Sequence, residues 1–208
     1  PYWLLTYSDL AEIFISPDDE NASVQLAFLR GALSELRIES NKNSGLGHIT
    51  VDSPVHFSLE ELRDKFIEAN EETDDFGRTK GPLYGKFDQL LVRLHSLMND
   101  SRYDFMLNPK LRTSTETLVD LMRDFVGLGD PKANVTVLNL SAVPYDVAPT
   151  VTALIGRLAF EFNFWNPKCL EFPIWLVCEE AQEYIPRAAH TRYKEARRTM
   201  EHISKAGR

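Results

Sequence analysis

The chain has 208 residues, of which 43% are hydrophobic and 26% charged, a balance typical of a folded protein with a sizeable core. No apolar run reaches the ~20 residues that span a bilayer, and the first residues show no targeting pattern, so we expect a cytoplasmic protein with no membrane partner. The two cysteines and five histidines have no zinc-type spacing, which argues against a structural metal site. Two cysteines are also too few for a disulfide framework. The net charge is −8.

The first 130 residues have the pattern of helices separated by polar loops. Apolar side chains recur every three or four residues, and the sequences S-L-E-E (58–61) and T-S-T-E (113–116) are capping boxes that favour helix starts. Gly127 favours the end of the last helix. We therefore predict an all-helical subdomain over residues 1–130. Its helices are expected over 8–14 (capped by Ser8), 23–37, from 58, around 87–97 and from 113, with a strand-like piece at 48–51.

From residue 134 the pattern changes to that of strands and helices in alternation. N-V-T-V-L-N-L-S (134–141) and P-I-W-L-V-C (173–178) are apolar and partly β-branched, and a helical pattern over 147–162 lies between them. This order predicts a right-handed βαβ unit whose two parallel strands are covered on both faces. A last helix is expected over 188–205. We expect three tryptophans in the core, namely Trp3, Trp165 and Trp175.

Two adjacent acids, Glu179 and Glu180, follow the second predicted strand directly. Ligands gather at the carboxyl ends of parallel strands, so both carboxylates can line a crevice instead of being buried without partners. In P-loop ATPases such a pair forms the Walker B element, in which one acid holds Mg²⁺ and the next orients the attacking water. Many strands also end in acids that only mark the surface, so this pair alone does not decide the function.

The charge is unevenly distributed along the chain. Residues 187–208 carry seven basic side chains against two acidic ones, a net +5, so the other 186 residues carry −13. This basic end could face phosphate, or it could be an ordinary solvated helix, and both interpretations remain open. For Arg197 and Arg198 individually, we favour solvated ion pairs over contact with DNA.

Three stretches together resemble the HerA-like family of hexameric DNA-translocating ATPases, which are relatives of FtsK. They are V-T-V-L-N-L-S-A-V-P-Y-D-V-A-P-T-V-T-A-L-I-G-R-L-A-F-E-F (135–162), F-P-I-W-L-V-C-E-E-A-Q-E-Y-I-P-R (172–187) and A-R-R-T-M-E-H-I-S-K-A-G-R (196–208). The opening P-Y-W-L-L-T-Y-S-D-L-A-E-I-F is similar to the segment where that family leaves its first core strands for a helical insertion. The resemblance implies an α/β fold, namely a partial RecA-like P-loop NTPase core over 131–208 that carries the large all-helical insertion of residues 1–130.

The resemblance also implies roles for individual residues. Glu179 matches the Walker B acid that is associated with Mg²⁺, and Glu180 matches the catalytic base. Arg208 matches an arginine that senses or neutralises phosphate charge, in its own subunit or across a subunit boundary, as a guanidinium fork can do. Gln182 stands where the family has His, which leaves open what that position contributes here.

The phosphate-binding loop of P-loop ATPases, G-x-x-x-x-G-K-[ST], does not occur in this sequence. G-P-L-Y-G-K-F (81–87) has three residues between its glycines and follows no predicted strand, so it does not qualify. We therefore expect an interior fragment that alone neither binds ATP tightly nor hydrolyses it. In the full-length protein the resemblance implies ATP and Mg²⁺ as cofactors, a hexameric ring of identical subunits, and duplex DNA as the translocated partner.

Two other interpretations remain open. A related ring ATPase could drive conjugation or secretion, or could act in a defence complex with a partner nuclease. Alternatively, the chain is a helical interaction module without catalytic activity, in which Glu179 and Glu180 only end a strand. Mg²⁺-dependent nucleotide binding that is lost on Glu179→Ala distinguishes the ATPases from the module.

Overall fold

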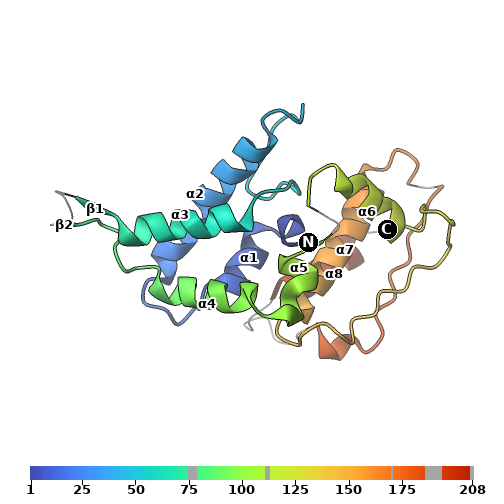
Figure 1. Ribbon diagram of the computed structural model, residues 1–208. Helices are drawn as coiled ribbons and strands as arrows, with labels where there is room; N and C mark the ends of the chain where they lie inside the picture. The colour runs from blue at the N-terminus through green and yellow to red at the C-terminus, as the bar shows by residue number, and fades with distance from the viewer. Residues whose placement is uncertain (75–78, 111–112, 170, 186–193, 207–208) are drawn as a thin grey trace. The chain divides into compact units, whose positions relative to one another are not determined.

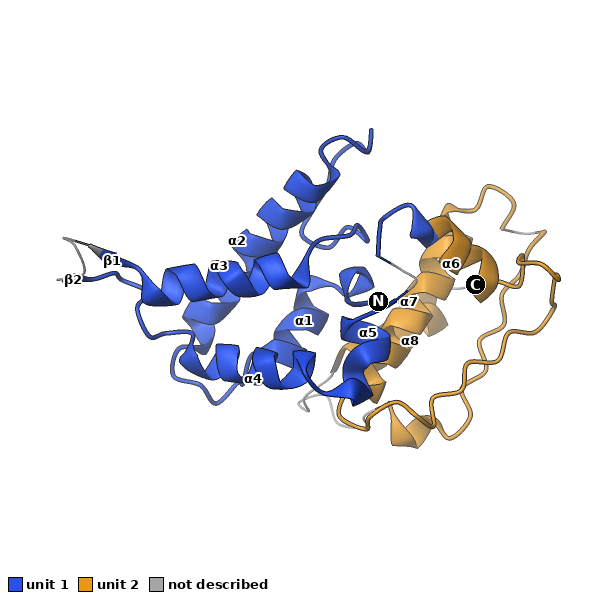
Figure 2. Ribbon diagram, in the orientation of Figure 1, with its two compact units in different colours: residues 1–118 blue, residues 119–208 orange. Residues whose placement is uncertain are grey.

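The computed structural model describes residues 1–74, 79–110, 113–169, 171–185 and 194–206. These residues form two compact units, 1–118 and 119–208, shown in different colours in Figure 2. Helices make up most of the first unit, whereas the second unit combines helices with long segments that belong to no helix or strand (Figure 1). Within the described part of the chain, no helix is both long and apolar enough to cross a membrane.

The first unit is helical except for one very short hairpin, in which β1 and β2 pair antiparallel with Thr73 opposite Lys80. This hairpin lies in one of the polar loops expected between the helices of residues 1–130. The helix α6 begins in the first unit and ends in the second. The elements of the first unit are η1 (Tyr2–Leu4), α1 (Tyr7–Phe14), α2 (Ala22–Asn41), α3 (Leu59–Glu71), β1 (Thr73–Asp74), β2 (Thr79–Lys80), α4 (Asp88–Met98), η2 (Ser101–Tyr103), α5 (Asp104–Leu107) and α6 (Thr117–Phe125).

Local sequence explains where several of these helices begin. Thr6, and not the predicted Ser8, caps α1, because its side chain accepts from the backbone N–H of Asp9 while the Asp9 carboxylate accepts from the N–H of Thr6. Ser58 caps α3 as predicted, by accepting from the backbone N–H of Glu61. The predicted cap at 113–116 is wrong in detail, because α6 begins only at Thr117.

A buried arginine organises the core of the first unit. Arg37 is fully buried on α2, and its guanidinium donates to the carbonyl oxygens of Leu5 at 2.7 Å, of Trp3 at 3.3 Å, and of Val51. The same group lies over the Phe57 ring, 5.2 Å from its centroid. A charge taken out of water is costly unless hydrogen bonds replace its hydration. Arg37 therefore connects α2 with the N-terminal segment and with the segment around Val51, through backbone carbonyl groups that lie in no β-sheet.

One turn further along α2, Asn41 extends this polar network. Its side-chain amide donates to the carbonyl oxygens of Arg37 at 2.9 Å and of His56 at 2.8 Å. The Thr115 hydroxyl donates to Asn41 Oδ1 at 2.7 Å and accepts from the backbone N–H of His56 at 2.8 Å. These bonds explain why α2 runs to Asn41 and not to Arg37 as predicted: Asn41 is buried and hydrogen-bonded at the end of the helix.

Three phenylalanines join α2, α3 and the start of α4. The rings of Phe28, Phe66 and Phe87 lie with their centroids 4.9–5.1 Å apart, in tilted and edge-to-face arrangements that favour aromatic pairs. Next to them, Asn70 accepts from the backbone N–H of Phe87 at 2.8 Å and donates to Asp88 at 2.7 Å. The end of α3 is thus bonded to the beginning of α4.

The second unit contains the rest of α6 and two long helices that pack against each other, α7 (Ala148–Trp165) and α8 (Lys194–Ala206), with a short turn η3 (Ala181–Glu183) between them. Gly156 allows the close approach of α7 and α8, because a Cβ there would lie 2.9 Å from Thr199 Cγ2 and 3.1 Å from Met200 Cε. The prediction of a helix between the two apolar segments is confirmed, and α7 runs three residues beyond its expected end. The last helix begins at Lys194, while residues 186–193 lie outside the described part.

The predicted strands at 134–141 and 173–178 are not seen as strands within the described residues. Both segments contain extended stretches that pair with no other segment there, and 48–51 forms no strand either. β-Branched side chains favour an extended backbone locally, but a strand also needs a neighbour to accept its hydrogen bonds. Without a ladder their side chains stay open to solvent: Trp175 is 88% exposed, and Trp165 at the end of α7 is 77% exposed, against our expectation of core positions.

Arg37→Met is expected to destabilise the first unit by about 3 kcal/mol, because it removes the guanidinium that donates to the carbonyl groups of Trp3, Leu5 and Val51. Urea unfolding followed by Trp3 fluorescence measures this in a Trp165→Phe, Trp175→Phe background, where Trp3 is the only tryptophan. Arg30→Met is the matched control on the exposed side of α2 and should cost less than about 1 kcal/mol. Equal losses at both positions would contradict the role given to Arg37.

Gly31→Ala and Gly156→Ala form a second test, since both glycines lie inside long helices. Gly31 has open space where a Cβ would stand, so alanine should stabilise α2 by about 0.5–1 kcal/mol. At Gly156 the new methyl group meets Thr199 and Met200, and overpacking by about 1–3 kcal/mol should outweigh that gain. Hydrogen exchange of peptides from α2, α7 and α8 measures each effect locally. A gain at both positions would show that α7 and α8 do not approach as closely as described.

Candidate functional site

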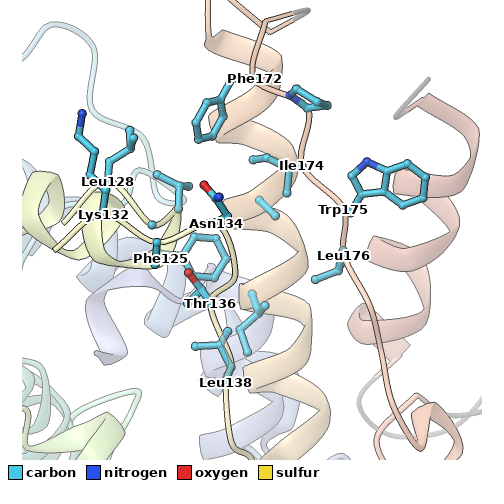
Figure 3. A pocket seen from close by; sticks show the side chains of 16 residues that line it. Phe125, Leu128, Lys132, Asn134, Thr136, Leu138, Phe172, Ile174, Trp175 and Leu176 are labelled. Atoms are coloured by element: carbon cyan, nitrogen blue, oxygen red, sulfur yellow. The ribbon is translucent and has the colours of Figure 1, made fainter. Parts of the chain in front are cut away.

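The two acids are reached by an extended segment whose side chains alternate between two sides. Ile174 and Leu176 line a hollow of about 380 Å³ in the second unit. Trp175 also borders this hollow, but it is 88% exposed, and Val177 is 78% exposed. Figure 3 shows Trp175 turned away from Ile174 and Leu176. This alternation is that of a strand, even though no ladder forms.

The hollow lies between the two extended segments and against α7. Asn134, Thr136 and Leu138 line it from one segment and residues 172–176 from the other, while Ile155 and Ala159 contribute from α7 (Figure 3). Most of these side chains are apolar. Glu179 and Glu180 are not among the described residues that line it. The hollow therefore separates two strand-like segments and is not itself a site for the acids.

The chain turns sharply at the two acids. Glu180 has φ +48°, the left-handed conformation that side-chain-bearing residues rarely adopt, at a cost of about 1–2 kcal/mol. The turn η3 follows at once, with the backbone N–H of Glu183 donating to the Glu180 carbonyl at 2.9 Å and that of Ile185 to the Ala181 carbonyl at 2.8 Å. A strained backbone held by such bonds is often found at functional sites.

Side chains from the turn contact both acids. The Gln182 amide donates to Glu180 Oε2 at 2.5 Å, and the Tyr184 hydroxyl donates to the Glu179 carbonyl oxygen at 2.5 Å. Partial burial raises the pKa of the Tyr184 hydroxyl above its usual value, and the nearby Cys178 thiol and the two glutamates raise it further. The phenol therefore stays protonated and keeps its hydrogen bond at all ordinary pH values.

Both carboxylates are exposed, and one or two carboxylates are the ligands that a protein usually contributes to a magnesium site. Mg²⁺ keeps several waters and usually takes one or two carboxylates together with phosphate oxygens. Within the described ranges, no three His, Cys, Asp or Glu side chains gather as metal ligands. The acids alone can thus hold a hydrated cation or orient a water, and a nucleotide would have to supply the other oxygens.

The basic end of the chain is described only in α8. Arg197 pairs with Glu201 at 2.7 Å and Arg198 with Glu195 at 2.7 Å, both within the helix, in agreement with the solvated ion pairs that we favour for these residues. Arg197 accordingly lowers the pKa of the Glu201 carboxyl. Arg208, the predicted phosphate-sensing residue, lies outside the described residues, so its role stays a prediction.

Residues 1–159 match the family model described as "Helicase HerA, central domain". The chain belongs to this family. The match covers more than half of the chain and confirms the resemblance drawn from the sequence, which places the chain among ATPases of the HerA and FtsK type. It ends before Glu179 and Glu180, so the roles of these acids stay predictions. No curated protein matches the chain at a significant level.

Sequence reasoning located the acids but missed what holds them. Gln182 stood out only for its difference from the HerA pattern, and the contact of Tyr184 with the Glu179 carbonyl was not predicted. The signal was present in their spacing, because a tight turn brings residues two and five positions further along back toward the acids. The sequence did not predict the left-handed backbone of Glu180, because residues with this conformation are usually Gly, Asn or Asp.

Replacing both Glu179 and Glu180 with Gln should lower the pKa of Tyr184 while leaving it above that of a free tyrosine, because burial and Cys178 remain. Carbon-13 NMR of labelled tyrosine rings measures the titration, with Tyr184→Phe assigning the signal. Glu171→Gln removes an acid outside the turn and should leave the titration unchanged. A Tyr184 signal that titrates alike with and without the two carboxylates would contradict the described turn.

Proposed function

We propose that this chain is part of a ring-forming ATPase of the HerA type that hydrolyses ATP to move duplex DNA, with Glu179 and Glu180 as its Walker B acids. The observation that carries this proposal is the HerA central-domain match over residues 1–159. A strand-like apolar segment that ends in two exposed carboxylates follows a short distance further along the chain. This is the order in which a P-loop ATPase core presents its acids.

The two acids have different roles in this proposal. Glu179 would hold Mg²⁺, and Glu180 would orient the attacking water and accept a hydrogen bond from it. Bound Mg²⁺ supplies positive charge to the phosphate oxygens. Adjacent residues of a strand-like segment point in different directions, so one carboxylate can face the metal while the next faces the water.

The phosphate-binding loop and the remaining core strands are supplied by sequence outside these 208 residues. We assign residues 1–130 to a helical insertion and 131–208 to part of a RecA-like core. In the complete core the segments 134–141 and 173–178 pair with neighbouring strands, which covers the apolar side chains that stand exposed along them. Arg208 neutralises phosphate charge within its own subunit or at the boundary with the next one in a hexamer.

In the full-length protein, Glu180→Gln is expected to lower kcat for Mg²⁺-ATP hydrolysis at least ~100-fold while ATP still binds, because water activation is lost and the phosphate contacts are not. Glu179→Ala should instead weaken Mg²⁺-dependent nucleotide binding. Steady-state hydrolysis with and without duplex DNA, together with a fluorescent-nucleotide binding assay, measures both. Duplex DNA should stimulate the wild-type rate.

Glu183→Gln is the matched control, because it removes an acid from the same turn and should leave hydrolysis and binding unchanged. The isolated chain, residues 1–208, should neither bind ATP tightly nor hydrolyse it. Turnover by the isolated chain that survives Glu180→Gln would refute the proposal. Unchanged nucleotide binding and turnover in both full-length variants would favour the non-catalytic interaction module.

A further inference from the structure

The turn after the strand-like segment contains a side-chain contact that the proposed roles of the acids do not use. Gln182 Nε2 donates to Glu180 Oε2 at 2.5 Å, across only two residues of sequence. An amide that donates to an ionised carboxylate makes a charge-assisted hydrogen bond, which is stronger than a bond between neutral groups. Both side chains are exposed, so burial does not force them together.

The backbone of the turn creates this contact. Glu180 has φ +48°, and the η3 turn begins at the next residue, so the chain folds back over a short distance. The Glu183 N–H bonds to the Glu180 carbonyl, and the Tyr184 hydroxyl bonds to the Glu179 carbonyl, so the backbone of both acids is held. With its backbone held, the Glu180 side chain needs only one further contact to have a defined orientation.

That contact leaves the carboxylate able to act. A carboxylate has two oxygens with about four acceptor positions, and the Gln182 amide takes one of them on Oε2. The remaining positions can accept a hydrogen bond from water. An amide also carries no ionisable proton, so it neither competes for the proton of that water nor changes its charge with pH.

We propose that Gln182 is a positioning residue for Glu180: its side-chain amide orients the carboxylate that activates the attacking water. This inference rests on the proposed function, because it gives Gln182 a role only where Glu180 is the base. Groups that orient catalytic or metal-binding side chains typically contribute about 10–100-fold to activity. Gln182 acts through Glu180 and need not touch the nucleotide.

Steady-state ATP hydrolysis by the full-length protein tests the role. Gln182→Leu keeps the size of the side chain and removes the donor, and should lower kcat about tenfold with KM for Mg²⁺-ATP unchanged. Gln182→His restores an N–H donor and should recover most of the loss, whereas Gln182→Glu places a second carboxylate beside Glu180 and should not. Glu183→Gln, in the same turn, is the control and should behave as wild type.

A double-variant cycle separates positioning from a general structural effect. Glu180→Asp shortens the carboxylate side chain so that Gln182 no longer reaches it, and Gln182→Leu should then cause no further loss of kcat. Full additivity of the two losses would overturn the inference. If Glu180→Gln abolishes turnover but Gln182→Leu does not lower it, the inference falls and the proposed function stands. If Glu180→Gln itself leaves turnover unchanged, the proposed function falls first.

A measurement on the isolated chain tests the contact without any nucleotide. In NMR spectra of the labelled protein, the Gln182 side-chain amide protons should show cross-peaks to the Glu180 side chain, and the three-bond HN–Hα coupling of Glu180 should report its left-handed backbone. Cross-peaks that are absent from the wild-type protein would overturn the inference. Cross-peaks that are present in the wild type and weaken in Glu180→Asp would support it.

Discussion

The first unit depends on one buried cation. Arg37 replaces its lost hydration with hydrogen bonds to the carbonyl groups of Trp3, Leu5 and Val51. A guanidinium suits this role because its donors spread in a fixed plane and it never loses its charge. The N-terminal segment, α2 and the connector before α3 are therefore held by a single side chain, and the aromatic cluster of Phe28, Phe66 and Phe87 completes the core.

The second unit differs from the first in this respect. Two of its segments have side chains that favour an extended backbone, but within the described residues neither segment pairs with a neighbouring strand. Its two extended segments have the residues of strands, and one alternates like a strand, yet their apolar side chains reach 82% exposure at Val137 and 88% at Trp175. Exposed apolar edges of this kind are unfavourable unless another element covers them. The proposed membership of a larger sheet explains why a chain would keep such segments beside a well-packed pair of helices.

The fold could be predicted from the sequence where the signal is short-range. The cap at Ser58, the helix between the apolar segments and the left-handed glycine after α6, Gly127, follow from spacing and side-chain chemistry alone. Whether the segments 134–141 and 173–178 pair into a sheet could not be predicted from spacing, because a ladder depends on a neighbouring strand. The acids at 179–180 were found as a pattern, whereas the contacts of Gln182 and Tyr184 required the path of the turn.

The sequence by itself determined the family, the mainly helical character of residues 1–130 and the positions of the two acids, because each depends on residue types at fixed spacing. Tertiary structure decided which charge is buried and which tryptophans are not. Arg37 sits one helical turn after Leu33 on the apolar stripe of α2, and nothing in its neighbours along the chain identifies the distant carbonyls that hold it. Long-range contacts of this kind arise only when separate segments pack, and packing is a property of the whole unit.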